Sequence, residues 1–73
     1  MENYMTLGFS HTHKIGSKTV DHDCVVVFES DTKEHGRELC FEMTGGKFHN
    51  HYFGDEWKEE EMLSYFPKGY VEV

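Results

Sequence analysis

The stretch that decides the predicted fold is Glu38–Phe53, ELCFEMTGGKFHNHYF. Apolar and polar side chains alternate on both sides of Gly45 and Gly46, which is the pattern of a β-hairpin closed by a two-residue turn. A tight turn sets the register of the two strands, and the register decides the face on which each side chain lies. The sequence therefore predicts two paired strands around a turn at these glycines.

The two faces of this predicted hairpin differ in chemistry. The apolar face is expected to pack in a core and consists of Leu39, Phe41, Met43, Phe48, Asn50 and Tyr52. The other face is expected to be exposed and consists of Glu38, Cys40, Glu42, His49, His51 and Phe53. This second face brings together a thiol, carboxylates and imidazoles, so it is either an interaction surface or a set of metal ligands.

A second hairpin is predicted nearer the N-terminus. A turn at Gly16–Ser17 joins an alternating strand that begins at Tyr4 to the strand Val20–Glu29, whose β-branched run indicates a central position in the sheet. The predicted register pairs Met5 with Phe28, Leu7 with Val26, Phe9 with Cys24, His11 with His22 and His13 with Val20. Cys24 is thereby expected in the core.

The C-terminal part of the chain favours a helix. Asp55 is a plausible N-cap, and Pro67 ends a helix that runs to about Phe66. Its core-facing arc is expected to hold Met62, Leu63, Tyr65 and Phe66, and its outer arc Glu56, Trp57, Glu60 and Glu61. The last residues, 70-YVEV-73, read as a short edge strand or a tail for a partner.

Together these elements predict one domain over residues 1–73 in the α+β class. The expected architecture is a small antiparallel meander of about four strands with one C-terminal helix packed on one face. A sheet covered on one side buries only a modest core, so the uncovered face is a candidate surface for a homodimer. The residues expected there are Tyr4, Val25, Val27 and Phe53.

The chain is strongly acidic, with 14 acidic and 7 basic side chains and a formal charge of −7. Such a charge argues against nucleic acid or an anionic membrane as the direct partner and favours a basic protein surface. The longest apolar run is too short to span a bilayer, and the first residues lack the features of a signal peptide. We therefore expect a cytoplasmic location and reduced cysteines.

Six histidines make a zinc site the alternative function. Side chains two apart in a strand point the same way, so each His-x-His pair can approach one ion. The first candidate ligand set is Cys40, His49 and His51, and the second is His11, His13 and His22. No longer metal motif accompanies them, and no placed acid–base pair or nucleophile motif indicates an enzyme. The primary prediction is therefore a non-enzymatic protein without a cofactor.

Acidic side chains are concentrated in Asp55–Glu61, where Trp57 lies among them. A charge run is usually a solvated face, but an exposed tryptophan is typical of binding hot spots. Carboxylates on a small rigid domain can imitate DNA phosphates and occupy the basic channel of a DNA-handling protein. The predicted partner-binding residues are Glu38, Glu42, Asp55, Glu56, Trp57, Glu59, Glu60 and Glu61.

In length, charge and expected fold, the chain resembles the small acidic phage-encoded inhibitors of host enzymes, several of which imitate DNA. Residues Met62–Phe66 (MLSYF) are also similar to the peptide by which proteins dock on the bacterial sliding clamp, with matches at Leu63, Ser64 and Phe66. Met62 replaces the glutamine that normally opens that peptide. The resemblance implies a viral inhibitor or regulator of a host DNA-handling protein that acts in the host cytoplasm.

Overall fold

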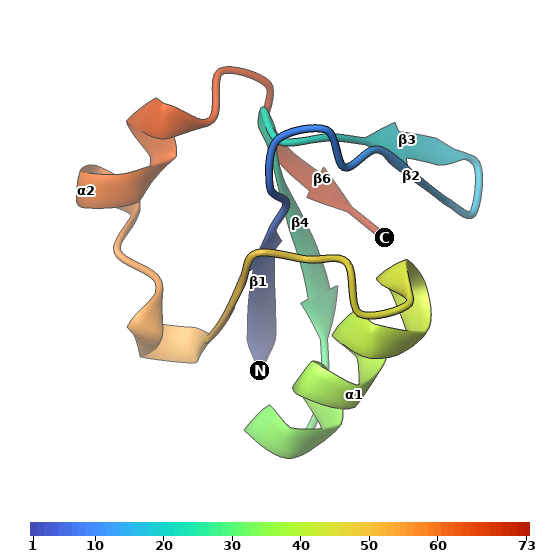
Figure 1. Ribbon diagram of the computed structural model, residues 1–73. Coiled ribbons are helices and arrows are strands. Elements are labelled where there is room, and N and C mark those ends of the chain that lie inside the picture. Colours follow the sequence, from blue (N-terminus) through green and yellow to red (C-terminus); the bar gives the residue numbers. More distant parts are fainter.

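A mixed four-stranded sheet lies at the centre of the computed structural model, which describes all residues 1–73 (Figure 1). The middle strands, β1 (Glu2–Thr6) and β4 (Cys24–Glu29), pair antiparallel. At the edges, β5 (Asn50–Phe53) pairs antiparallel with β1, and β6 (Gly69–Glu72) pairs parallel with β4. The α+β class and the interior place of β4 are confirmed, whereas the antiparallel meander is wrong.

The hairpin at Gly16–Ser17 is confirmed as a separate two-stranded sheet of β2 (His13–Ile15) and β3 (Lys18–Val20). Gly16 has a φ of 62°, a left-handed conformation that glycine adopts without steric cost. His13 pairs with Val20, as predicted.

The predicted pairing of β1 with β4 is wrong by two residues, since Met5 pairs with Val26 and not with Phe28. The segment Leu7–Thr12 on one side is longer than Asp21–Asp23 on the other, so the two ladders are not continuous. The other pairs that this discontinuity removes are Leu7 with Val26, Phe9 with Cys24 and His11 with His22. A shift of two residues keeps each side chain on its predicted face, because successive residues alternate.

Residues Lys33–Thr44 form the helix α1, so the predicted hairpin around Gly45 is wrong. The helix begins at an N-cap, where the Thr32 hydroxyl accepts a hydrogen bond from the backbone N–H of His35 at 3.1 Å. It ends at Gly45, whose φ of 66° forms a left-handed C-cap. Glycine suits that cap as well as a hairpin turn, so this signal had two meanings.

The buried face of α1 consists of small residues four positions apart, namely Gly36, Cys40 and Thr44. The residues of this face are only weakly apolar, so they give little sign of a helix. Leu39 and Phe41, by contrast, follow the two-residue alternation that is typical of a strand. Phe41, predicted in the core, is 49% exposed. The hydrophobic contrast that identifies most helices is therefore weak in this one.

One face of the sheet is covered by α1 (Figure 1). Ile15 and Val20 of the β2–β3 hairpin belong to the same core. The buried members of this core are Met5, Leu7, Val20, Cys24, Val26, Phe28 and Cys40. The place of Cys24 is confirmed, whereas the exposed place predicted for Cys40 is wrong. Both thiols are free.

The opposite face is covered by three short helical turns in place of the predicted continuous helix. These turns are η1 (Gly54–Glu56), α2 (Glu59–Met62) and η2 (Leu63–Tyr65). The chain is extended at Trp57, with φ −82° and ψ 126°, and this break turns the indole toward the sheet. Burial of a tryptophan stabilises by more than the helix propensity of the few residues given up, which explains the interruption.

The same segment covers the face that was predicted to be open for a homodimer. Val25 is fully buried and Val27 is 6% exposed. Tyr4 and Phe53 are half-buried. Val25 and Val27 are therefore covered by the chain's own residues, whereas Tyr4 and Phe53 keep part of their surface exposed.

Candidate functional site

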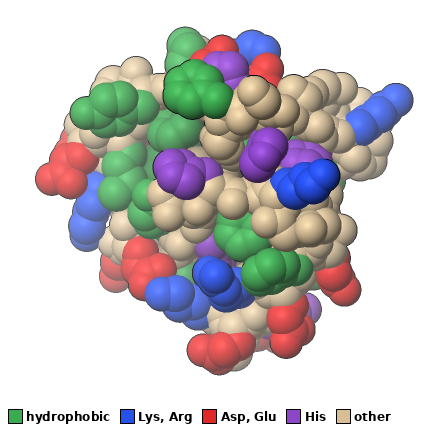
Figure 2. Space-filling model, in the orientation of Figure 1, with side chains coloured by type: hydrophobic (Ala, Val, Ile, Leu, Met, Phe, Trp, Pro, Cys, Tyr) green, Lys and Arg blue, Asp and Glu red, His purple; other side chains and the backbone are tan.

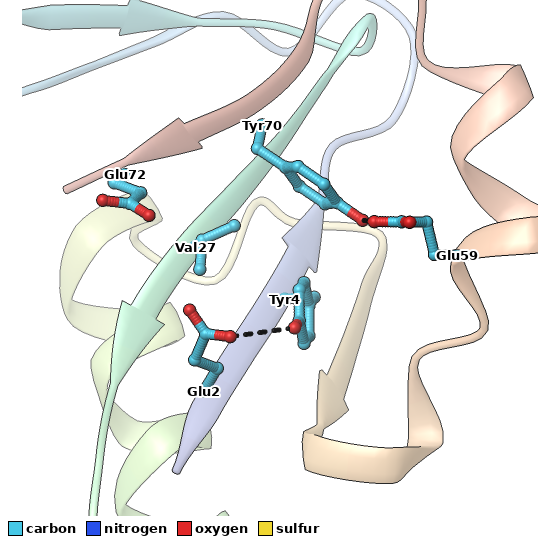
Figure 3. A pocket seen from close by; sticks show the side chains of 6 residues that line it. All are labelled: Glu2, Tyr4, Val27, Glu59, Tyr70 and Glu72. Carbon is cyan, nitrogen blue, oxygen red and sulfur yellow. Dashed lines mark hydrogen bonds between the residues drawn. The ribbon is translucent and has the colours of Figure 1, made fainter.

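A hollow of about 190 Å³ lies over the strands β1, β4 and β6, on the face covered by α2 (Figure 3). We call it the acidic hollow. It is lined by Glu2, Tyr4, Val27, Glu59, Tyr70 and Glu72. Only Glu59 belongs to the partner-binding set predicted from the sequence, so the acidic hollow is a feature that the structure adds.

Strand register brings the lining together from distant parts of the chain. Tyr4 pairs with Val27 across β1 and β4, and Val27 pairs with Glu72 across β4 and β6. Glu2 and Tyr70 lie two residues from Tyr4 and Glu72, so the pleat points them to the same face. Glu59 comes from α2, and its carboxylate meets the hydroxyl end of Tyr70 (Figure 3).

An aromatic cluster around Trp57 holds the two tyrosines of the hollow in place. The Tyr4 and Trp57 rings stack with centroids 5.1 Å apart and planes 11° apart. The indole also contacts Tyr52, Phe66 and Tyr70, with centroids 5.4, 6.2 and 6.3 Å away. Such aromatic contacts add to the stabilisation from burial, so they favour the observed placement of the two tyrosine rings.

Hydrogen bonds orient two of the carboxylates. The Tyr70 hydroxyl accepts from the indole N–H of Trp57 at 2.9 Å and donates to Oε1 of Glu59 at 2.5 Å. The Tyr4 hydroxyl donates to Oε1 of Glu2 at 3.2 Å. Burial, followed by the neighbouring carboxylate, raises the pKa of both tyrosines, so the hydroxyls keep their protons at neutral pH.

The predicted exposure of Trp57 is wrong, since its side chain is 8% exposed and packed inside the protein. Glu56 is also less free than expected, because it forms an ion pair with Lys33 at 2.5 Å and accepts the backbone N–H of Phe53. The Lys33 ammonium, through its hydrogen bond, and then the Phe53 N–H hold the pKa of Glu56 below its ordinary value. Both residues serve the fold.

The other predicted partner-binding residues are exposed and form no ion pair, namely Glu38, Glu42, Asp55, Glu59, Glu60 and Glu61. They do not form one surface. Glu38 and Glu42 lie on α1, whereas α2 carries the glutamates of the opposite side of the sheet (Figure 1). On the face shown in Figure 2, acidic side chains likewise lie in separate groups near the periphery.

Neither predicted zinc-ligand set is assembled, and no three histidine, cysteine or acidic side chains are placed to hold a metal ion. Cys40 lies on the buried face of α1, and burial raises the pKa of its thiol to about 11. His49 is exposed, while His51 is hydrogen-bonded to Asn3. At the other end, the ring of His22 packs on Phe9, with centroids 4.7 Å apart.

The segment similar to the clamp-docking peptide is folded into the domain. Met62 ends α2, and Leu63 begins η2. Phe66 packs against Trp57, so the side chain that would anchor such a peptide is used inside the protein. The segment is therefore neither extended nor free in this structure.

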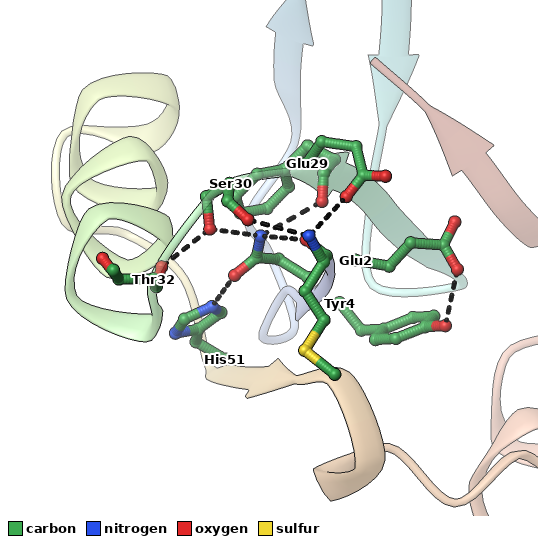
Figure 4. Close-up of polar contacts among 9 residues, drawn as sticks. Glu2, Tyr4, Glu29, Ser30, Thr32 and His51 are labelled. Carbon is green, nitrogen blue, oxygen red and sulfur yellow. Dashed lines mark hydrogen bonds and ion pairs between the residues drawn. The ribbon is translucent and has the colours of Figure 1, made fainter.

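A buried polar network lies beneath α1, next to the sheet (Figure 4). The Asn3 side-chain amide donates to Oγ of Ser30 at 2.8 Å and to the carbonyl of Phe28 at 3.2 Å. The Asn3 Oδ1 must then accept from Nε2–H of His51, 2.7 Å away. The remaining ring nitrogen of His51, Nδ1, is buried without a partner.

This network predicts a loss of stability in mild acid. Burial and the Arg37 and Lys33 charges lower the pKa of His51, against a smaller opposite effect of Glu56. The His51 imidazole therefore binds a proton less readily in the folded state than in the unfolded state. The free energy of unfolding should then fall as the pH drops from 6.5, the ordinary pKa of histidine, toward the lower pKa of the folded state. We expect His51→Gln to flatten this dependence between about pH 7 and 5 in urea unfolding, above the range where carboxylates titrate.

The exposed His35, also near the N-terminal end of α1, offers the control. His35→Gln controls for the loss of a histidine as such, because this side chain is exposed and takes no part in the buried network. An NMR titration in which the His51 ring ionises at or above pH 6.5 would contradict this prediction.

The residues that sequence reasoning missed carry a recognisable pattern. Glu2 and Tyr4 are two apart in β1, and Tyr70 and Glu72 are two apart in β6. Each pair presents one carboxylate and one ring to the same face of its strand. The signal was present as E-x-Y and Y-x-E, but only the parallel pairing of β6 with β4 shows that the two pairs meet.

None of the helices combines the length and hydropathy needed to cross a lipid bilayer. No protein-family model matches the chain, and the comparisons with curated proteins and with solved structures find no match either.

Proposed function

We propose that this protein is a non-enzymatic binder of a basic protein surface, which it contacts through the acidic hollow and the exposed glutamates of α2. The observation that carries the proposal is the gathering of Glu2, Glu59 and Glu72 around two tyrosine rings. These carboxylates form no ion pair within the protein. A partner's cations can therefore pair with them without displacing an internal ion pair.

The surrounding charge supports the same proposal. Asp55, Glu60 and Glu61 are exposed and belong to the segment that supplies Glu59. With a formal charge of −7, the whole molecule attracts a basic partner and steers its approach. Glu38 and Glu42 on α1 face a different side and contribute to the long-range field.

The partner class we propose is a DNA-handling protein of the host cytoplasm, which this protein inhibits or regulates. The binding surfaces of such proteins are basic because they neutralise phosphates, and carboxylates can compete for the same positions. Inhibition follows if the protein and DNA cannot occupy that surface together.

Affinity capture from a bacterial lysate tests the proposal, because a partner held by charge should be released by salt and by competing duplex DNA. We expect capture at about 50 mM salt to fall steeply by about 300 mM. Glu59→Gln combined with Glu60→Gln and Glu61→Gln should reduce capture more than a control that combines Glu34→Gln, Glu38→Gln and Glu42→Gln on α1. A partner indifferent to salt and DNA, or no partner, would contradict it.

A further inference from the structure

The acidic hollow offers hydrogen-bond acceptors and no free donor. The hydroxyl protons of Tyr4 and Tyr70 are directed to Glu2 and Glu59, and the indole N–H of Trp57 is directed to Tyr70. In both of these glutamates the second carboxylate oxygen, Oε2, has no partner. A ligand that fits must therefore bring donors and positive charge.

Basic side chains of the protein leave the acidic hollow unneutralised. Lys18 donates from Nζ to the main-chain carbonyl of Glu72, so its contact is with the backbone rather than with the carboxylate. Lys33 and Lys68 are paired elsewhere, with Glu56 and Asp21. The three carboxylates of the hollow thus face a space bounded by aromatic and aliphatic groups.

The shape of the hollow distinguishes among cationic ligands. The carboxylates come from three different elements and are not close enough together to hold a metal ion. The tyrosine rings are 6.1 Å apart and inclined by 54°, and they stand over Val27. A flat cation that stacks on a ring and bridges separated carboxylates fits better than a compact ammonium, which is strongly hydrated.

We propose that the acidic hollow binds the side chain of one arginine of the partner. The guanidinium stacks against a tyrosine ring and donates to the free oxygens of Glu2 and Glu59, and its aliphatic stem lies along Val27. Glu72 adds negative charge at the same side as Glu2 (Figure 3). This inference rests on the proposed function, since it names the group of the basic partner that the site recognises.

An NMR titration of the purified protein tests the inference without the partner. The probes are N-acetyl-arginine methylamide and its lysine and citrulline counterparts, citrulline being nearly isosteric with arginine but uncharged. We expect arginine to shift the Val27 methyl and Trp57 indole N–H signals, lysine to bind at least about threefold more weakly, and citrulline to give no shift. Equal affinities for arginine and lysine, or the absence of shifts with arginine, would overturn the proposal.

Matched variants distinguish arginine binding in the acidic hollow from nonspecific attraction by the protein's negative charge. Glu59→Gln and Glu60→Gln remove one charge each from neighbouring positions of α2, but only Glu59 lines the hollow. The first should weaken arginine binding about fivefold or more and the second less than about twofold. Equal effects would overturn the site, provided that both spectra keep the dispersion of the folded protein.

The two proposals fail in distinguishable ways. Arginine binding to the purified protein without capture of a partner contradicts the proposed function and leaves the site intact. Suppose instead that a partner is captured in a salt-sensitive way, that Glu59→Gln weakens capture no more than Glu60→Gln, and that arginine does not bind. That result contradicts the arginine site and leaves the proposed function intact.

Discussion

Replacing Gly36 with alanine is expected to destabilise the protein by about 2 kcal/mol or more, although alanine is the better helix former. A Cβ at this position would lie 2.0 Å from Oδ1 of Asn3 and 3.0 Å from Oγ of Ser30. Asn3 cannot move aside easily, because its amide is fully buried and hydrogen-bonded to Ser30, Phe28 and His51. Thermal unfolding should show a melting temperature lower by about 10 °C or more.

Gly8→Ala provides the matched control for this substitution. The Cβ at Gly8 would meet only Nδ1 of His11 at 3.7 Å, an ordinary contact, so its effect should be small. The variant Asn3→Ala should cost less in the Gly36→Ala background than in the parent protein, because it removes the clashing amide. Additive effects of the two substitutions would contradict the proposed clash.

Replacing Trp57 with alanine is expected to be the most damaging single change, with a cost of about 3–5 kcal/mol. The indole joins β1, β5 and β6 to the covering segment through its ring contacts and its hydrogen bond to Tyr70. The single core of a domain this small rarely supplies more than about 3–5 kcal/mol of stability, so this variant should be largely or wholly unfolded at 37 °C. Circular dichroism is the suitable measurement, because Trp57 is the only tryptophan.

Two further variants of the same segment make this prediction specific. Trp57→Phe keeps part of the ring contact and should be intermediate, since it loses the hydrogen bond to Tyr70. Tyr65→Ala removes an aromatic side chain that is 75% exposed and should change stability by less than about 0.5 kcal/mol. Equal losses for Trp57→Ala and Tyr65→Ala would show that the indole does not hold this segment to the sheet.

The sequence was most informative where local signals had one meaning. The run Cys24–Phe28 is β-branched and apolar, and it forms the interior strand β4. The turn at Gly16–Ser17 closes the predicted hairpin. At Gly45 the local signal was ambiguous, because a left-handed glycine ends a helix or turns a hairpin equally well. The small buried face of α1 could not settle the choice.

The candidate site was less predictable than the fold because it depends on non-local pairing. Glu59 was identified from the local concentration of acid, but Glu2 and Glu72 lie near opposite ends of the sequence. Trp57 was placed on the outer arc because helical periodicity was extended through it, whereas the backbone leaves the helical region there. Tertiary burial of one large ring outweighed a local preference, as is common for aromatic residues.

The position of β6 makes ligand binding in the acidic hollow depend on the pairing of β6 with the rest of the sheet. β6 is held to the sheet by parallel pairing with β4, and pairings between residues so far apart in sequence form slowly because loop closure is entropically costly. A molecule in which β6 has detached retains Glu2 and Tyr4 but lacks Tyr70 and Glu72. A ligand of the acidic hollow would therefore bind only chains with β6 docked, and by mass action it would protect that strand from fraying and proteolysis.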